Sequence, residues 1–304
     1  MNYLRIARLL GILLLVVAGC MATSIPWSWY YGEAQTITAF LYSSGITACA
    51  GFVLWFMGRK EKGTIFRGEA ILVVGASWLL LGVFGGIPYL LDGAFSNPAD
   101  AYFETISGFT TTGSTVLEDI ESLSMGLHWW RCLTHWLGGM GIIVLFVAIF
   151  PQLGVGGKFL FKSEVPGPIT EGLKPKIKST ASTLWWIYVG FTVTEAIILR
   201  VLGMTWHDAF THAFATLATG GFSTKGGSIA SFGSVGIDFV VTFFMLVAGI
   251  NFGLYYEVIR GKIKSVVKDR ELWAYLGIIA VATVIITLSI YGDPPLEKHG
   301  SLFE

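Results

Sequence analysis

The chain has 304 residues, of which 54% are hydrophobic and 13% charged, and its mean hydropathy is +0.67. Soluble domains carry about 25% charged residues, so this composition indicates a polytopic membrane protein. The formal net charge is zero, which excludes the basic surface typical of a nucleic-acid binder. The three cysteines lack the spacing of a metal site or a disulfide framework and are expected to be plain apolar residues.

Runs of about 20 apolar residues predict transmembrane helices. Such runs lie, in chain order, near 9–31, 35–57, 69–91, 132–153, 180–203, 236–257 and 272–292. The first run has an alternative, because "VAGC" at Val17–Cys20 resembles a lipoprotein signal cleavage site. The run continues past Cys20 into aromatic residues typical of a membrane interface, which favours a span.

Two shorter apolar segments lie between these runs, near 100–110 and 207–217. At about 11 residues each, a helix would reach about 16 Å, which is half the thickness of a bilayer. We therefore expect re-entrant half-helices, with short surface helices as the alternative.

The distribution of Lys and Arg predicts the orientation. With a cytoplasmic N-terminus and both short segments re-entering from outside, most basic residues fall on the cytoplasmic side. These residues are Arg5, Arg8, Arg59, Lys60, Lys62, Arg67, Lys158, Lys162, Lys174, Lys176, Lys178, Arg260, Lys262, Lys264, Lys268 and Arg270. Had either short segment crossed the membrane fully, the later basic loops would alternate sides.

The two short segments resemble each other. "DAYFETISGFTTTGST" begins at Asp100, and "DAFTHAFATLATGGFST" begins at Asp208. An alignment with one gap pairs Thr112-Gly113 with Thr219-Gly220. Each copy lies between two spans, so the predicted unit is a span, a half-helix, a polar loop and a span, written twice.

This unit divides the chain into four expected parts. Residues 1–60 form a two-span hairpin, 61–160 the first pore repeat and 161–265 the second. Residues 266–304 would hold the first span and the start of the half-helix of a third repeat, because "GSLFE" at Gly300–Glu304 aligns with "DAYFE". The chain is therefore expected to be the front part of a longer protein. The alternative is a pore that two chains build from two repeats each.

The polar loops are suited to an ion pathway. Backbone carbonyls at membrane depth are tolerated only where they are buried in protein or line a water-filled cavity. Carbonyls aimed inward can replace the hydration shell of a cation, and glycine allows successive carbonyls to face one side. A tight loop rich in turn formers is the alternative for one loop, but two loops in matching positions favour a pathway.

The motifs resemble those of the Trk/Ktr/HKT superfamily of potassium transporters, most closely the bacterial TrkH type. The resemblance covers nearly the whole chain and rests on "SGFTTTGST", "HWLGGMGIIVLFVAIFPQLGVGG", "PGP", "FATLATGGFST" and "NFGLYYEV". It implies an all-α, potassium-channel-like membrane fold in which four repeats surround one pore, preceded by an extra two-helix hairpin. It also implies potassium uptake across the bacterial inner membrane. No nucleophile, base and orienting group come together in the sequence, so no enzymatic activity is expected.

The resemblance also implies the site residues. Potassium would contact main-chain oxygens of Thr111, Thr112, Gly113, Ala218, Thr219 and Gly220. Thr110, Ser114, Gly221 and Glu104 would lie in the vicinity of the pore. Glycine at both Gly113 and Gly220 implies a preference for potassium, with a sodium-permeable relative as the alternative. The third and fourth filters and the gating loop of the family are absent from this chain.

The implied partners are membrane lipid, a cytoplasmic nucleotide-binding regulatory subunit similar to TrkA, and a second copy of the complete subunit in a homodimer. The transported ion, K+, is the only implied cofactor. The implied location is the inner membrane, with a cytoplasmic N-terminus.

Several other polar residues have two interpretations. Glu118, Asp119 and Glu121 would either concentrate cations at a pore mouth or form a solvated loop. Glu104 would face the pore or be structural, whereas a structural role is favoured for Glu195. Arg131 would open the fourth span, where it would snorkel to the interface or anchor the filter loop.

Histidines allow a function of another class, a haem-binding redox subunit. The residues in question are His128, His135, His207 and His212. Most of them fall near the expected outer interface, and no span carries two deep histidines a few turns apart, which argues against haem. "GGMG" at Gly138–Gly141 is interpreted as a close-packing helix surface.

Overall fold

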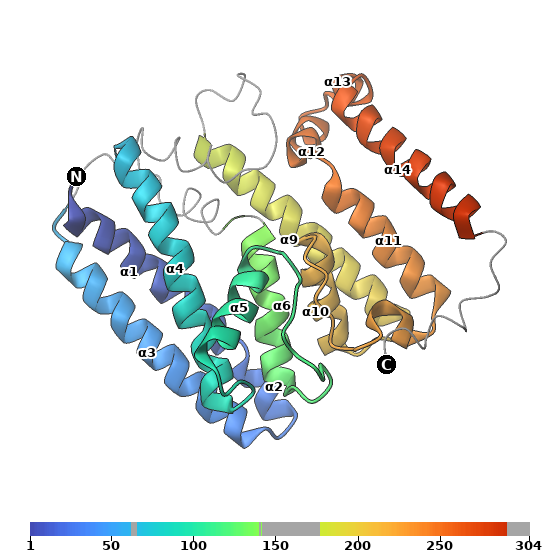
Figure 1. The fold of residues 1–304 in the computed structure, drawn as a ribbon. Helices are drawn as coiled ribbons and strands as arrows, with labels where there is room; N and C mark the ends of the chain where they lie inside the picture. Colours follow the sequence, from blue (N-terminus) through green and yellow to red (C-terminus); the bar gives the residue numbers. More distant parts are fainter. Residues whose placement is uncertain (62–65, 140, 142–176, 291–304) are drawn as a thin grey trace. The chain divides into compact units, whose positions relative to one another are not determined.

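The computed structural model describes residues 1–61, 66–139, 141 and 177–290. Every element in this part of the chain is helical, which confirms the expected all-helical class. The elements are α1 (Tyr3–Ala22), α2 (Ile25–Tyr30), α3 (Ala34–Gly58), α4 (Arg67–Asp92), α5 (Pro98–Phe109), α6 (Met125–Gly139), α9 (Ile177–Val201), α10 (Trp206–Leu217), the 3-10 helix η2 (Ser228–Phe232), α11 (Val235–Gly249), α12 (Phe252–Ile259), α13 (Ile263–Val267) and α14 (Arg270–Ile290) (Figure 1). They belong to two compact units, Met1–Gly249 and Ile250–Glu304.

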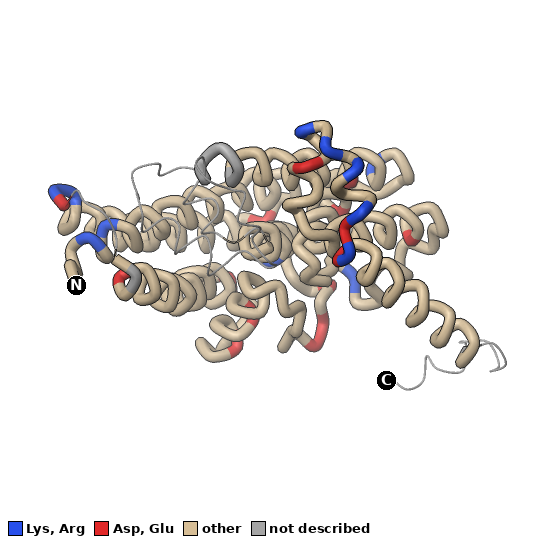
Figure 2. Tube along the Cα trace, turned by 90° about the horizontal axis from the view of Figure 1, so that it is seen from above, with Lys and Arg blue, Asp and Glu red and all other residues tan. Residues whose placement is uncertain are grey.

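Five helices of the described residues are long and apolar enough to cross a membrane, with α1 and α2 counted as one. The others are α3, α4, α9 and α14, and α11 with α12 would make a sixth if the two form one broken span. Charged residues lie mainly near helix ends and in the connections, whereas the helix bodies are largely uncharged (Figure 2).

Two expected spans differ from the structure. The run 236–257 was expected to be continuous and is not: α11 ends at Gly249, and α12 begins at Phe252. The Asn251 side chain accepts a hydrogen bond from the Gly253 N–H (2.9 Å), so it caps the start of a new helix. The fourth expected span, 132–153, begins earlier, at Met125, and its second half lies outside the described residues.

The helices α1 and α3 pack as an antiparallel pair (Figure 1). Glycines permit the close approach, because a side chain on Gly11 would overlap the backbone of Gly51 and Trp55. About two turns further along, where α1 begins and α3 ends, a side chain on Gly58 would overlap the Leu4 carbonyl oxygen. This is the two-helix hairpin expected at the start of the chain.

The short helices α5 and α10 both have 12 residues and lie between longer helices, as expected. Each begins at a capped residue: the Asn97 side chain accepts from the Ala99 N–H, and the Thr205 hydroxyl accepts from the Asp208 N–H. Helix α5 packs against α4 and α6, and α10 packs against α9 and α11. Helix α10 also packs against α6, and this contact joins the two span–half-helix–span repeats.

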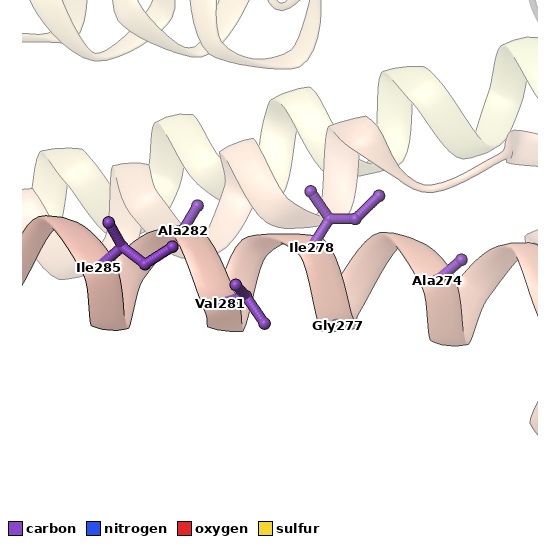
Figure 3. A pocket seen from close by; sticks show the side chains of 6 residues that line it. All are labelled: Ala274, Gly277, Ile278, Val281, Ala282 and Ile285. Atoms are coloured by element: carbon purple, nitrogen blue, oxygen red, sulfur yellow. The ribbon is translucent and has the colours of Figure 1, made fainter.

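In the second unit, α14 carries a pocket lined by residues at helical spacing along one face (Figure 3). The lining residues are Ala274, Gly277, Ile278, Val281, Ala282 and Ile285. All six are apolar, so this pocket offers no group that would bind an ion or take part in a reaction.

Candidate functional site

The chain leaves the two half-helices in the same way. In each loop, three successive N–H groups donate back to carbonyls of the last helical turn, at spacings of four, three and five residues. In the first loop the pairs are Thr110–Ile106, Thr111–Gly108 and Thr112–Ser107, at 2.8, 3.0 and 2.9 Å. In the second they are Ala218–Phe214, Thr219–Thr216 and Gly220–Ala215, at 3.2, 2.9 and 2.9 Å. Each residue of the first loop therefore corresponds to the residue 108 positions later.

This register corrects the alignment made from the sequence. The segments align from Asp100 and Asp208 without the expected gap, so Gly113 corresponds to Gly221 and not to Gly220. The backbone angles agree, since φ is +76° at Gly113 and +87° at Gly221. Ala218 takes the place of Thr110, and it is buried whereas Thr110 is exposed. The gap in the sequence alignment pairs the two Thr-Gly dipeptides. The backbone hydrogen bonds and angles repeat without that gap, so the dipeptides do not occupy equivalent positions.

Two threonines adopt a strained backbone at matching positions. Thr111 has φ of +54° and Thr219 has φ of +55°. Positive φ costs a residue other than glycine about 1–2 kcal/mol, and it is rare for a β-branched residue. Among the described residues, Ser228 is the only other non-glycine residue with positive φ. Strain of this kind collects at functional sites, and here it occurs twice in the same place.

The two loops touch each other. A side chain on Gly113 would overlap the carbonyl oxygen of Gly220, so the backbones of the two loops are in direct contact. Behind them, a side chain on Gly138 would overlap the Phe109 carbonyl, and one on Gly139 would overlap the Cα of Ala218. The expectation that the glycines of "GGMG" form a close-packing surface is confirmed for these two residues.

Several hydroxyl groups of the first loop form local hydrogen bonds. The Thr110 hydroxyl donates to the Ile106 carbonyl (2.7 Å) and lies 2.7 Å from the Thr112 hydroxyl. The Ser107 hydroxyl donates to the Ser114 carbonyl (2.5 Å). These bonds satisfy the hydroxyls, and the Ser107 bond holds Ser114 next to the last turn of α5.

Glu104 and Arg131 form a buried ion pair behind the loops. The Arg131 Nε–H donates to Glu104 Oε1 at 2.6 Å, and the two side chains are 1% and 0% exposed. Arg131 lies in the middle of α6, so the expectation that it opens a span and snorkels is wrong, whereas a contact with the loops is observed. Glu104 accepts hydrogen bonds from the Thr115 hydroxyl and the Val116 N–H (3.1 Å), so it contacts the extended segment that follows Gly113, called here the returning strand of the loop.

In the second loop, a hydrogen bond takes the place of the Glu104 contact at the equivalent position. His212 corresponds to Glu104 and Ser223 to Thr115, and the His212 Nε2 lies 2.9 Å from the Ser223 hydroxyl. The Thr224 hydroxyl donates to Asp208 Oδ1 (2.7 Å). Burial raises the pKa of Asp208, but hydrogen bonds from Thr224 and Thr205 outweigh burial, so the net pKa is lowered from its ordinary value.

Three other expected residues lie around this site. The His135 Nδ1 lies 2.7 Å from the Gly108 carbonyl, and the ring stacks on Phe222 at 4.0 Å. His207 Nε2 lies 2.9 Å from the Met125 carbonyl, so it holds α10 to α6. Glu121 is exposed and lies 3.4 Å from Lys225 in the other loop. Among the described residues, no group of three His, Cys, Asp or Glu side chains is arranged to hold a metal ion.

Sequence reasoning singled out Glu104 and Arg131 separately and did not pair them. An arginine and a glutamate inside apolar segments are a signal for pairing, because an isolated charge there is costly. Ser223 and the stacking role of Phe222 gave no sequence signal of their own.

Comparison with known proteins identifies a matching protein family. The family model for TrkH, described as a cation transport protein, matches residues 36–290. The chain is similar to the Trk system potassium uptake protein TrkH of Escherichia coli (strain K12), with 38% identity over 294 residues, and to TrkG of the same organism, with 32% identity over 300 residues. It covers 61% of the length of each of these relatives, which in turn match 96% and 97% of this chain.

A solved structure shares the fold. The crystal structure of the potassium transporter TrkH from Vibrio parahaemolyticus is similar, with a TM-score of 0.80 and 31% sequence identity. The similarity covers 96% of this chain and 60% of that chain.

Proposed function

This chain belongs to the TrkH family of cation transport proteins, and we propose that its two loops are strands of a potassium filter used for uptake across the bacterial inner membrane. The observation that carries the proposal is the repeated backbone: two contacting loops with strained threonines and positive-φ glycines at equivalent positions. Main-chain oxygens held at fixed positions replace the hydration shell of a cation.

The proposed ligands are the main-chain oxygens of the two loops in the register of the structure. They are those of Thr111, Thr112 and Gly113 and of Thr219, Gly220 and Gly221. Ala218 corresponds to Thr110, which precedes the filter, so both residues end the half-helices in this proposal. The negative ends of α5 and α10 point toward the loops and favour a cation there.

The arrangement in the membrane follows the positive-inside pattern. We infer a cytoplasmic N-terminus, pore repeats at 61–160 and 161–265, and a third repeat beginning after 266. Lipid would contact the exposed apolar faces of the spans. The names of the relatives support potassium as the transported ion. A cytoplasmic nucleotide-binding subunit and a homodimer of the complete subunit remain part of the proposal.

The test is growth of an uptake-deficient bacterium at limiting potassium, with the full-length gene and with Gly113→Ser. We expect the full-length gene to restore growth and the variant to lose preference for potassium over sodium, measured as the ratio of Rb+ to Na+ uptake. Gly93→Ser is the matched control, because Gly93 also has positive φ, +85°, but caps α4 away from the loops. An unchanged ratio in Gly113→Ser would refute the filter assignment.

A further inference from the structure

The buried side chain of Arg131 connects the segments that follow Gly113 and Gly221 in the two loops, directly in one case and through Glu104 in the other. Its Nε–H donates to Glu104, and its Nη1–H donates to the Ser223 carbonyl at 3.0 Å. The guanidinium carbon lies 3.5 Å from the centre of the Phe222 ring, next to Ser223. The second loop is therefore bound to Arg131 directly.

The first loop is bound to Arg131 through Glu104. The Thr115 hydroxyl donates to both Glu104 carboxylate oxygens, at 2.9 and 3.0 Å, and the Val116 N–H donates to one of them. Thr115 and Ser223 are equivalent residues, and each follows a positive-φ glycine by two positions. Arg131 and Glu104 thus connect equivalent points of the two strands.

The chemistry of this connection makes it rigid. The guanidinium is planar, so its donors to Glu104 and Ser223 keep a fixed mutual geometry. Both charged groups are buried, and a buried charge whose partner moves away is strongly penalised. The ion pair therefore helps to fix the separation of the two strands, in addition to the contact between the loops at Gly113 and Gly220.

We propose that Arg131 is a positioning residue which, with Glu104, fixes the separation of the two filter strands and thereby sets the preference for potassium over sodium. The inference rests on the proposed function. Selectivity has been ascribed to the size of the carbonyl cage and to the number and field strength of its carbonyls. The size of the cage and the field of its carbonyls both depend on the distance between the strands. A shorter distance favours the smaller ion.

The experiment compares Arg131→Lys with wild type in the full-length protein, reconstituted in liposomes. Lysine keeps the positive charge near Glu104, but its single ammonium group does not reproduce the planar fork. We expect the ratio of Rb+ to Na+ uptake to fall at least about tenfold, equivalent to about 1.4 kcal/mol. The matched control is Arg5→Lys, in the Arg5–Glu69 pair at 3.3 Å between α1 and α4, where the ratio should not change.

The amount of folded protein and the uptake ratio are measured on the same preparations, because a purely structural role would lower the amount without changing the ratio. A well-folded Arg131→Lys protein with the wild-type ratio would overturn the inference. If Arg131→Lys does not fold, Thr115→Val decides. It keeps the ion pair and the Val116 N–H bond but removes both hydrogen bonds from the Thr115 hydroxyl to Glu104, and the expected fall is about threefold, equivalent to about 0.6 kcal/mol. No fall would overturn the inference.

Failure of the proposed function gives a different result. In that case wild type itself would not transport Rb+, or Gly113→Ser would leave the ratio unchanged. Selective wild type, an altered Gly113→Ser and an unaltered Arg131→Lys would reject the positioning role alone.

Discussion

The two loops have the same backbone and different support. Three hydrogen bonds and two positive-φ residues recur at an offset of 108 residues, whereas Glu104 in the first half-helix is replaced by His212 in the second. The first loop is bound through the Glu104 carboxylate of a buried ion pair, whereas the second is bound by the Arg131 guanidinium, by His212 and by a partly exposed aspartate. What the repeat preserves is thus the path of the main chain, which is expected if main-chain oxygens carry the function.

The largest expected difference in stability is between two single variants, Glu104→Gln and His212→Gln, which change equivalent residues of the two half-helices. Glu104→Gln leaves Arg131 buried without its carboxylate, which typically costs about 3–5 kcal/mol. His212→Gln removes a neutral contact with the Ser223 hydroxyl and should cost about 0.5–1.5 kcal/mol. The check is the thermal stability of each purified full-length variant in detergent.

Equal losses in the two glutamine variants would contradict the distinction between the ion pair of Glu104 and the hydrogen bond of His212. The double variant Glu104→Gln with Arg131→Met serves as the control. It removes both charges, so it should recover part of the stability lost in Glu104→Gln.

A smaller difference is expected between the equivalent glycines. Alanine at either Gly113 or Gly221 adds about 1–2 kcal/mol of backbone strain, because φ is positive at both. At Gly113 the new methyl group also overlaps the Gly220 carbonyl, whereas at Gly221 it meets no described atom within 4 Å. Overlap of this kind adds about 1–3 kcal/mol, so Gly113→Ala should be the less stable variant.

The glycine comparison is measured as the midpoint of thermal unfolding of the two alanine variants, prepared in parallel. Gly93→Ala is the reference for backbone strain alone, since its nearest contact is an ordinary 3.7 Å from the Gln35 side chain. If Gly113→Ala unfolds at the same temperature as Gly93→Ala, the two loops are not in contact at Gly113.

Much of the fold could be predicted because hydrophobic length is a strong signal. The half-helices α5 and α10 were expected within a few residues of their actual bounds, because a 12-residue apolar helix between two longer ones is visible in the pattern. The break after Gly249 was missed, since apolar residues continue through it and only Asn251 marks a new helix start. Hydropathy measures the length of an apolar run and not its continuity.

The site was predicted only in part, because the register of the loops and the packing between helices are not contained in local sequence patterns. The loops could be identified from their composition, but their register could not, because the Thr-Gly pairs suggested a gap that the backbone lacks. The pairing of Glu104 with Arg131 depends on how α5 packs against α6, and no local pattern contains that information. Packing between helices decides which of the isolated polar residues meet.

The smallest expected difference concerns the start of each half-helix. Asp208 and Asp100 are equivalent first-turn residues, but Asp208 accepts from the Thr224 hydroxyl, whereas Val116, the counterpart of Thr224, has no hydroxyl. At pH 7, Asp208→Asn should cost about 1–2 kcal/mol through the helix dipole and the hydrogen bond. Asp100→Asn should cost only about 0.3–1 kcal/mol through the dipole.

The stability that Asp208 contributes should depend on pH. Because folding lowers the pKa of Asp208, its contribution is present above the unfolded pKa, near 3.9, and is lost as the pH falls through the lower folded pKa. The stability gap between wild type and Asp208→Asn should therefore be full at pH 7 and shrink below about pH 4. Thr224→Val leaves the carboxylate in place and tests the hydrogen bond alone. A gap that persists unchanged at pH 3 would show that the aspartate acts through packing and not through its charge.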